Sequence, residues 1–133
     1  FVYIDDYAHH PRELDATLSA AKELYPNRKI TAIFQPHLFS RTKDLCDEFA
    51  ASLSKVDELI LLDIYPAREK PIEGVTSQIV LDKVSIANKR IVSKNELMDY
   101  LKDNAGIDVL LTVGAGDIDT KIIEIKNLLN NRS

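Results

Sequence analysis

The sequence predicts a single α/β domain, in which helices cover both faces of an open, mostly parallel β-sheet. Three observations lead to this prediction. Short apolar segments alternate with segments of helical periodicity along the chain. The segment ELILLDIY, residues 58–65, is apolar without alternation, which indicates a strand buried on both faces of a parallel sheet. The length of 133 residues fits one domain of ordinary size.

The first strand, the first helix and the second strand follow from residues 1–34. FVYI is an apolar segment that predicts a strand ending at Asp5. Pro11 marks the start of the first helix, because proline is favoured in a first helical turn. Pro26 and Asn27 end this helix, whose apolar residues recur with helical spacing at Leu14, Leu18, Ala21 and Leu24. KITAIF, residues 29–34, predicts the second strand.

A second helix, the third strand and a long loop come next. Helical spacing predicts the second helix from Thr42 onward, through Leu45, Phe49 and Leu53. Residues 58–65 are the third predicted strand. Residues 66–76 contain two prolines and a glycine, which indicates a loop.

The C-terminal part continues the alternation. A weaker helical pattern surrounds Ile79, Val80 and Val84, and KRIV, residues 89–92, predicts a short strand. Asn95 is a candidate cap for a helix that carries Leu97 and Leu101. IDVLLTV, residues 107–113, predicts the last strand. A final helix is expected after Gly116, with apolar residues at Ile118, Ile122, Ile125 and Leu129.

Composition narrows the class of protein. Hydrophobic residues make up 45% and charged residues 29%, which is typical of a globular chain. A net charge of -4 without a basic stripe argues against nucleic acid as a partner, and no apolar run is long enough to span a membrane. No secretory signal is visible in these residues, and the only cysteine, Cys46, predicts a small core residue and a cytoplasmic location. The start at Phe1 suggests a piece of a longer protein.

Polar motifs follow the predicted strands at the point where each strand ends. They occupy residues 5–10, 35–41, 63–68 and 114–117. Because parallel strands end at the same edge of a sheet, where α/β proteins bind ligands, we expect these four motifs to converge.

Each motif has a functional and a structural interpretation. Asp5 and Asp6 can hold a metal ion or ribose hydroxyls, or one of them can cap the next helix. His9 and His10 are adjacent and would not face one site together, so we predict no metal site even with His37 and Asp6 nearby.

The motif FQPHLFSRT, residues 34–42, combines a proline that ends a strand with two polar side chains four residues apart. Arg41 suits a carboxylate or phosphate because its planar fork donates two parallel hydrogen bonds, and the alternative is an exposed arginine paired with an acidic neighbour. VGAGD, residues 113–117, can let a ligand approach closely or can be a plain turn. The sequence holds no nucleotide P-loop of the form GxxxxGK[ST].

One alternative is a receiver-like signalling domain. Such domains place an acidic pair and a phosphoacceptor aspartate at neighbouring strand ends, and Asp63 would be the acceptor. The last strand lacks the lysine that these domains carry, and the interval from Asp6 to Asp63 is long for them.

DDYAHHP, FQPHLFSRT, DIYPAREKPIEGV and TVGAGDI together resemble the C-terminal domain of the Mur ligases, in the order in which that family has them. FQPH favours the branch that joins L-alanine to UDP-N-acetylmuramate over the related branch that recycles a tripeptide. The resemblance implies a Rossmann-like fold for residues 1–133 and a three-domain parent. In that parent an N-terminal domain binds the UDP-sugar, and a central domain carries the P-loop and most of the Mg²⁺ site.

The resemblance also implies a reaction and the residues that serve it. ATP converts the substrate carboxylate to an acyl phosphate, the amine of L-alanine attacks it, and phosphate leaves. Asp6 matches a position associated with the nucleotide, and Tyr7 and His9 match positions that face the cleft. His37 and Arg41 match positions around the amino acid, His37 to orient its amine and Arg41 to hold its carboxylate. Without the other two domains we expect this chain to be inactive.

Overall fold

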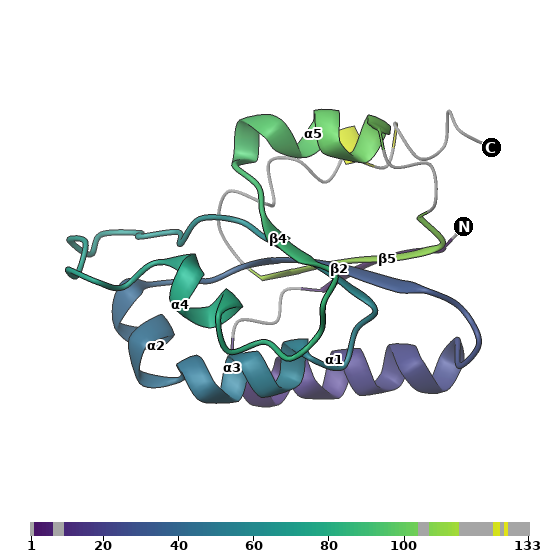
Figure 1. The fold of residues 1–133 in the computed structure, drawn as a ribbon, viewed down its shortest axis with the longest axis horizontal. Coiled ribbons are helices and arrows are strands. Elements are labelled where there is room, and N and C mark those ends of the chain that lie inside the picture. Colours follow the sequence, from purple (N-terminus) through teal and green to yellow (C-terminus); the bar gives the residue numbers. More distant parts are fainter. Residues whose placement is uncertain (1, 7–9, 104–106, 115–123, 126, 128–133) are drawn as a thin grey trace.

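The computed structural model describes residues 2–6, 10–103, 107–114, 124, 125 and 127. Strands and helices alternate through these residues as the sequence predicts (Figure 1). In chain order the elements are β1 (Val2–Asp6), α1 (Pro11–Leu24), β2 (Ile30–Gln35), α2 (Phe39–Asp44), α3 (Cys46–Leu53), β3 (Glu58–Leu61), α4 (Ser77–Leu81), β4 (Lys89–Ile91), α5 (Lys94–Asp103) and β5 (Val109–Gly114).

The described strands form one five-stranded sheet in the order β1-β5-β2-β3-β4, and every neighbouring pair is parallel. The predicted mostly parallel sheet is therefore confirmed. β2 and β5 lie in the interior of the sheet, and every residue in both strands is buried. The apolar composition of both strands without alternation follows from this burial.

Helices cover both faces of the sheet, as predicted (Figure 1). On one face α1, α3 and α4 pack against the strands through buried residues that include Leu18, Phe34, Phe49, Val80 and Leu111. Cys46 belongs to this cluster, which confirms the predicted core cysteine. On the other face α5 covers a smaller cluster that includes Ile33, Ile60, Leu97, Leu101, Leu110 and Ile125. None of the described helices is long and apolar enough to cross a membrane.

Two helix boundaries differ from the prediction. The second predicted helix is two helices, α2 and α3, because Leu45 leaves helical geometry with φ −113° and ψ 16°. Ser93, and not Asn95, caps α5. The Ser93 hydroxyl accepts the amide of Glu96 at 3.2 Å, the cap bond, and donates to the Glu96 carboxylate at 2.7 Å.

The final predicted helix, from Ile118 to Leu129, lies mostly outside the described residues. Glu124, Ile125 and Asn127 have helical geometry, and Ile125 is buried. These three residues agree with the predicted helix.

Candidate functional site at the carboxyl edge of the sheet

Because all five strands are parallel, their C-terminal ends share one edge of the sheet, at the left in Figure 1. We call this the carboxyl edge and define it by residues 5–6, 35–41, 63–69 and 114. The structure thus brings together the described parts of the four predicted motifs. Tyr7 and His9 lie outside the described residues, so their roles remain predictions.

The chain after β2 is joined to the chain after β3, beyond the regular strands. The Tyr65 amide donates to the Pro36 carbonyl at 2.8 Å, and the Leu38 amide donates to the Tyr65 carbonyl at 2.8 Å. His37 and Tyr65 form an isolated parallel bridge, and their ring centroids are 5.6 Å apart. These contacts hold His37 at the carboxyl edge although Pro36 ends the strand.

Arg41 lies in the first turn of α2. Leu38, which precedes the helix, has φ 70° and ψ 137°, a conformation that costs a non-glycine residue free energy. Nη1 of Arg41 is buried and has no hydrogen-bond partner among the described residues. A buried donor of this kind favours a ligand with an acceptor, and the planar guanidinium suits a carboxylate.

A backbone contact closes the carboxyl edge between β2 and β5. Gly114 has φ 119°, and a Cβ at this position would lie 2.7 Å from the carbonyl oxygen of Gln35. The Gln35 side chain is buried and donates to the Asp63 carbonyl at 3.2 Å. Gly114, which lies in the motif predicted to permit close approach, therefore allows the backbone of β2 to lie close to it.

Asp5 and Asp6 point to opposite faces of the sheet, as successive strand residues must. Thr112 donates to Asp5 at 2.7 Å, so the Tyr3 hydroxyl, 2.9 Å from Thr112, acts as the donor in that second pair. Burial raises the pKa of Tyr3, which stays protonated and keeps its role as a donor. Thr17 of α1 donates to Asp6 at 2.6 Å.

His10, and not an aspartate, caps α1. Its Nδ1 accepts the amide of Arg12 at 3.3 Å. The interpretation of Asp5 or Asp6 as the helix cap is therefore wrong. Both carboxylates remain at the carboxyl edge, where a carboxylate repels phosphate and accepts hydrogen bonds from ribose hydroxyls. No group of three potential metal ligands occurs in the part of the chain that the structure describes.

Glu69 is a residue of the carboxyl edge that the sequence analysis did not single out. Its carboxylate accepts the amide of Ser40 at 3.1 Å and also pairs with the Ser40 hydroxyl. The sequence offered no signal for this contact, because the partners are 29 residues apart and lie in a loop and a helix.

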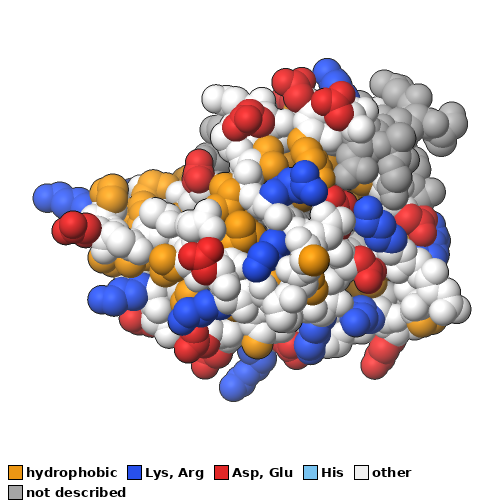
Figure 2. Space-filling model, in the orientation of Figure 1, with side chains coloured by type: hydrophobic (Ala, Val, Ile, Leu, Met, Phe, Trp, Pro, Cys, Tyr) orange, Lys and Arg blue, Asp and Glu red, His pale blue; other side chains and the backbone are white. Residues whose placement is uncertain are grey.

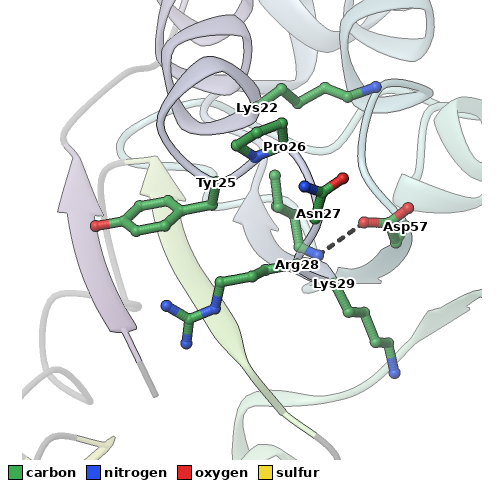
Figure 3. Close-up of a pocket in the computed structure, with 8 residues that line it drawn as sticks. Lys22, Tyr25, Pro26, Asn27, Arg28, Lys29 and Asp57 are labelled. Atoms are coloured by element: carbon green, nitrogen blue, oxygen red, sulfur yellow. Dashed lines mark hydrogen bonds between the residues drawn. The ribbon is translucent and has the colours of Figure 1, made fainter.

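A hollow of about 520 Å³ lies at the opposite edge, which we call the amino edge and define by residues 22–30, 57–58 and 108 (Figure 3). Three of the charged side chains that line it, those of Arg28, Lys29 and Asp57, have partners within the chain. Arg28 forms a two-pronged pair with Asp108 through Nε, which lies 2.9 and 3.0 Å from the two carboxylate oxygens, and through Nη2. Lys29 lies 3.4 Å from Glu58, and Asp57 accepts the amide of Ile30 at 2.8 Å. The candidate functional site therefore remains the carboxyl edge.

A family model described as Mur ligase, glutamate ligase domain, matches residues 1–116. The chain belongs to this family. A UDP-N-acetylmuramate–L-alanine ligase of Flavobacterium psychrophilum is 58% identical over 132 residues. The match covers 99% of this chain and 29% of that protein, so the chain spans less than a third of this Mur ligase.

Solved Mur ligases share the fold. The crystal structure of a UDP-N-acetylmuramate-alanine ligase from Thermotoga maritima matches with a TM-score of 0.70 and 29% identity, over 98% of this chain and 27% of its own. A murein peptide ligase from Psychrobacter arcticus matches with a TM-score of 0.74 over 97% of this chain and 27% of its own. Because the Psychrobacter arcticus protein is only 22% identical to this chain, that match supports a shared fold and nothing more.

The strand order excludes the receiver-like alternative. In a receiver the first strand lies next to the third. Here β5 and β2 lie between β1 and β3, so Asp6 and Asp63 are three strand spacings apart, or about 14 Å. An acidic pair at the end of β1 cannot share a metal ion with a phosphoacceptor at that distance.

Proposed function

We propose that this chain is the C-terminal domain of an ATP-dependent ligase that joins L-alanine to UDP-N-acetylmuramate in peptidoglycan precursor synthesis. Its 58% identity to a ligase of that name supports the substrates. The observation that carries the proposal within this chain is the buried Nη1 of Arg41 at the carboxyl edge. A free amino acid needs a cation for its carboxylate, and the fork of Arg41 fits that group.

The other residues of the proposed site have roles that follow from their place and chemistry. His37 lies in the segment that leads to Arg41, so it can orient the amine of L-alanine for attack. When bound, ATP supplies the phosphoryl group that activates the carboxylate of the sugar substrate. Asp6 fits the ribose of that nucleotide as a hydrogen-bond acceptor. Tyr7 and His9 are included in the proposed site on the resemblance alone.

In this proposal the other two domains of the full-length enzyme bind the groups that this chain does not bind. The chain has no P-loop, so the phosphates and Mg²⁺ belong mainly to a central domain, and the UDP-sugar to an N-terminal one. Hydrophobic side chains gather at the left of Figure 2, near the carboxyl edge, where a neighbouring domain would cover them. On the same face acidic and basic side chains are interspersed, which favours a protein neighbour over nucleic acid or an anionic membrane. A cytoplasmic location, where ATP is available, is part of the proposal.

Phosphate release by the full-length protein tests the proposal. With ATP, Mg²⁺ and UDP-N-acetylmuramate, release should require L-alanine, and L-serine or glycine should support less of it. The isolated 133-residue chain should release none. If the tripeptide L-alanyl-γ-D-glutamyl-diaminopimelate supported release and L-alanine did not, the protein would belong to the tripeptide-recycling branch.

A further inference from the structure

The helix that carries Arg41 begins without a cap of its own. The first amides of a helix have no partner inside the helix and need an acceptor from elsewhere. The residue at the cap position of α2 is Leu38, whose side chain makes no capping hydrogen bond. Ser, Thr, Asp or Asn would normally supply that acceptor. The first turn of α2 must therefore be fixed by another part of the chain.

Glu69 supplies the acceptor from the loop that follows β3. Its carboxylate accepts the Ser40 amide at 3.1 Å and pairs with the Ser40 hydroxyl. These bonds, with the Ser40 hydroxyl first and the nearby charge of Arg41 last, lower the pKa of Glu69. Glu69 is therefore ionised at neutral pH, and its negative charge lies at the positive end of the helix dipole.

The loop holds Glu69 in place through its own contacts. The Glu69 amide donates to the Pro66 carbonyl at 2.9 Å, which closes a tight turn. Ala67 within this turn has φ 53°, a left-handed conformation that an alanine adopts at a cost in free energy. Tyr65, just before the turn, is tied to Pro36 and Leu38 by the backbone hydrogen bonds described above. The turn and the start of α2 are thus joined at two places.

Arg41 follows Ser40 directly, so whatever fixes the turn also directs its guanidinium. We propose that Glu69 is a positioning residue that holds the first turn of α2 and thereby aims Arg41 at the carboxylate of the bound amino acid. This inference rests on the proposed function. The carboxylate of Glu69 bonds to the amide and hydroxyl of Ser40, so in this proposal it acts through Arg41 and not on the substrate itself. A small displacement of a binding group is enough to weaken catalysis markedly.

Steady-state kinetics of the full-length enzyme test the inference. Glu69→Gln loses the charge and one acceptor, and should raise the KM for L-alanine about tenfold while the KM values for ATP and UDP-N-acetylmuramate change less than about twofold. Ser40→Ala removes one of the two Ser40 contacts and should give a smaller change in the same direction. Glu73→Gln is the matched control, because Glu73 is an exposed glutamate of the same loop, and it should leave all three KM values unchanged.

A double-mutant cycle distinguishes a positioning role from a general loss of structure. If Glu69 acts through Arg41, Glu69→Gln should have no further effect on the KM for L-alanine in an Arg41→Ala background. An equal effect in both backgrounds, or a parallel rise of all three KM values, would overturn the inference while the proposed function stood. So would a Glu69→Gln enzyme with the parental KM.

Failure of the proposed function would be recognised separately, as an enzyme that needs no L-alanine. Amide hydrogen exchange at Ser40 would then decide whether Glu69 holds the turn. Glu69→Gln should speed this exchange about tenfold and Glu73→Gln should not, because only the first removes the charge that strengthens the hydrogen bond from that amide. Unchanged exchange would overturn the inference.

Discussion

Each edge of the sheet carries an arginine, and the two arginines differ in their hydrogen-bond partners. At the amino edge Arg28 is paired with Asp108 through both Nε and Nη2 and lies over the ring of Tyr25, with 5.5 Å from Cζ to the ring centroid. At the carboxyl edge Nη1 of Arg41 is buried without a partner among the described residues. A hollow with charged walls is therefore not by itself a site. A site needs polar groups that the fold has left unsatisfied.

The amino edge also contains a buried carboxylate that the fold satisfies. Glu58 is 2% exposed, and it accepts from Tyr100 at 2.6 Å and from Thr31 at 3.1 Å. Burial by itself would raise the pKa of Glu58, but the bond from Tyr100, the charge of Lys29 and the bond from Thr31 together lower it. This network spans β2, β3 and α5, so it contributes to stability at the edge opposite the proposed site.

The largest expected effect concerns the tight contact at the carboxyl edge. Gly114→Ala should reduce the free energy of unfolding by about 2–5 kcal/mol, because it adds left-handed strain to a clash with the backbone of Gln35. Gly74→Ala is the control. Gly74 has φ 79° but open space around it, so that variant should lose only about 1–2 kcal/mol. Urea unfolding of both variants measures the difference, and equal losses would show that strain alone matters.

Arg41 should affect catalysis and not folding. Arg41→Ala should raise the KM for L-alanine about ten- to hundredfold in the full-length enzyme, the loss of a charged hydrogen bond worth about 1.5–3 kcal/mol. Arg41→Lys keeps the charge but loses the fork, so it should fall between Arg41→Ala and the parent. The KM for UDP-N-acetylmuramate should change much less. Parental kinetics in both variants would show that Arg41 does not hold the amino acid.

Tyr100→Phe should lower stability and leave the kinetics normal, which is the reverse of the effect expected for Arg41→Ala. Removing the hydrogen bond to the Glu58 carboxylate should cost about 1.5–2 kcal/mol at neutral pH. Because the pKa of Glu58 is lowered in the folded state, this contribution is present above the unfolded pKa and is lost as the pH falls through the folded value. Urea unfolding from neutral to acidic pH should therefore show the variant and the parent converging.

Asp6 should contribute to ATP use beyond its bond to α1. Asp6→Ala should raise the KM for ATP about two- to tenfold, the effect of one lost hydrogen bond of about 0.5–1.5 kcal/mol. Thr17→Val removes the donor to Asp6 but keeps the carboxylate, so it should lose similar stability with an unchanged KM for ATP. If the two variants had the same stability and the same KM for ATP, Asp6 would contribute only to folding.

The smallest effect is expected at the exposed pair of the amino edge. The side chains of Arg28 and Asp108 are 37% and 36% exposed, so water and salt screen their attraction. Arg28→Ala should lower the melting temperature less than Tyr100→Phe does, and the difference from the parent should shrink at high salt. Kinetics with L-alanine should be unchanged, in contrast to Arg41→Ala.

Local pattern was enough to predict most of the fold. Unbroken apolar segments gave the buried parallel strands, and Pro11 gave the start of α1. The break at Leu45 and the cap at Ser93 were missed, because apolar spacing continues across the first and Asn95 is as suitable a cap by type as Ser93. In the candidate site, the convergence of Asp5, Asp6 and the 35–41 motif on one edge was predictable. Parallel strands all end there.

Residue spacing and strand direction can be read from the sequence, and they predict the order of elements, the parallel sheet and the edge at which the polar motifs lie. Only the tertiary structure decided that β1 is an edge strand beside β5, which separates Asp6 from Asp63. It alone decided that Asp108 neutralises Arg28, 80 residues away, while Glu69 caps the helix of Arg41. The physical reason is that such contacts depend on strand order and loop path, and no short stretch of sequence encodes either of them.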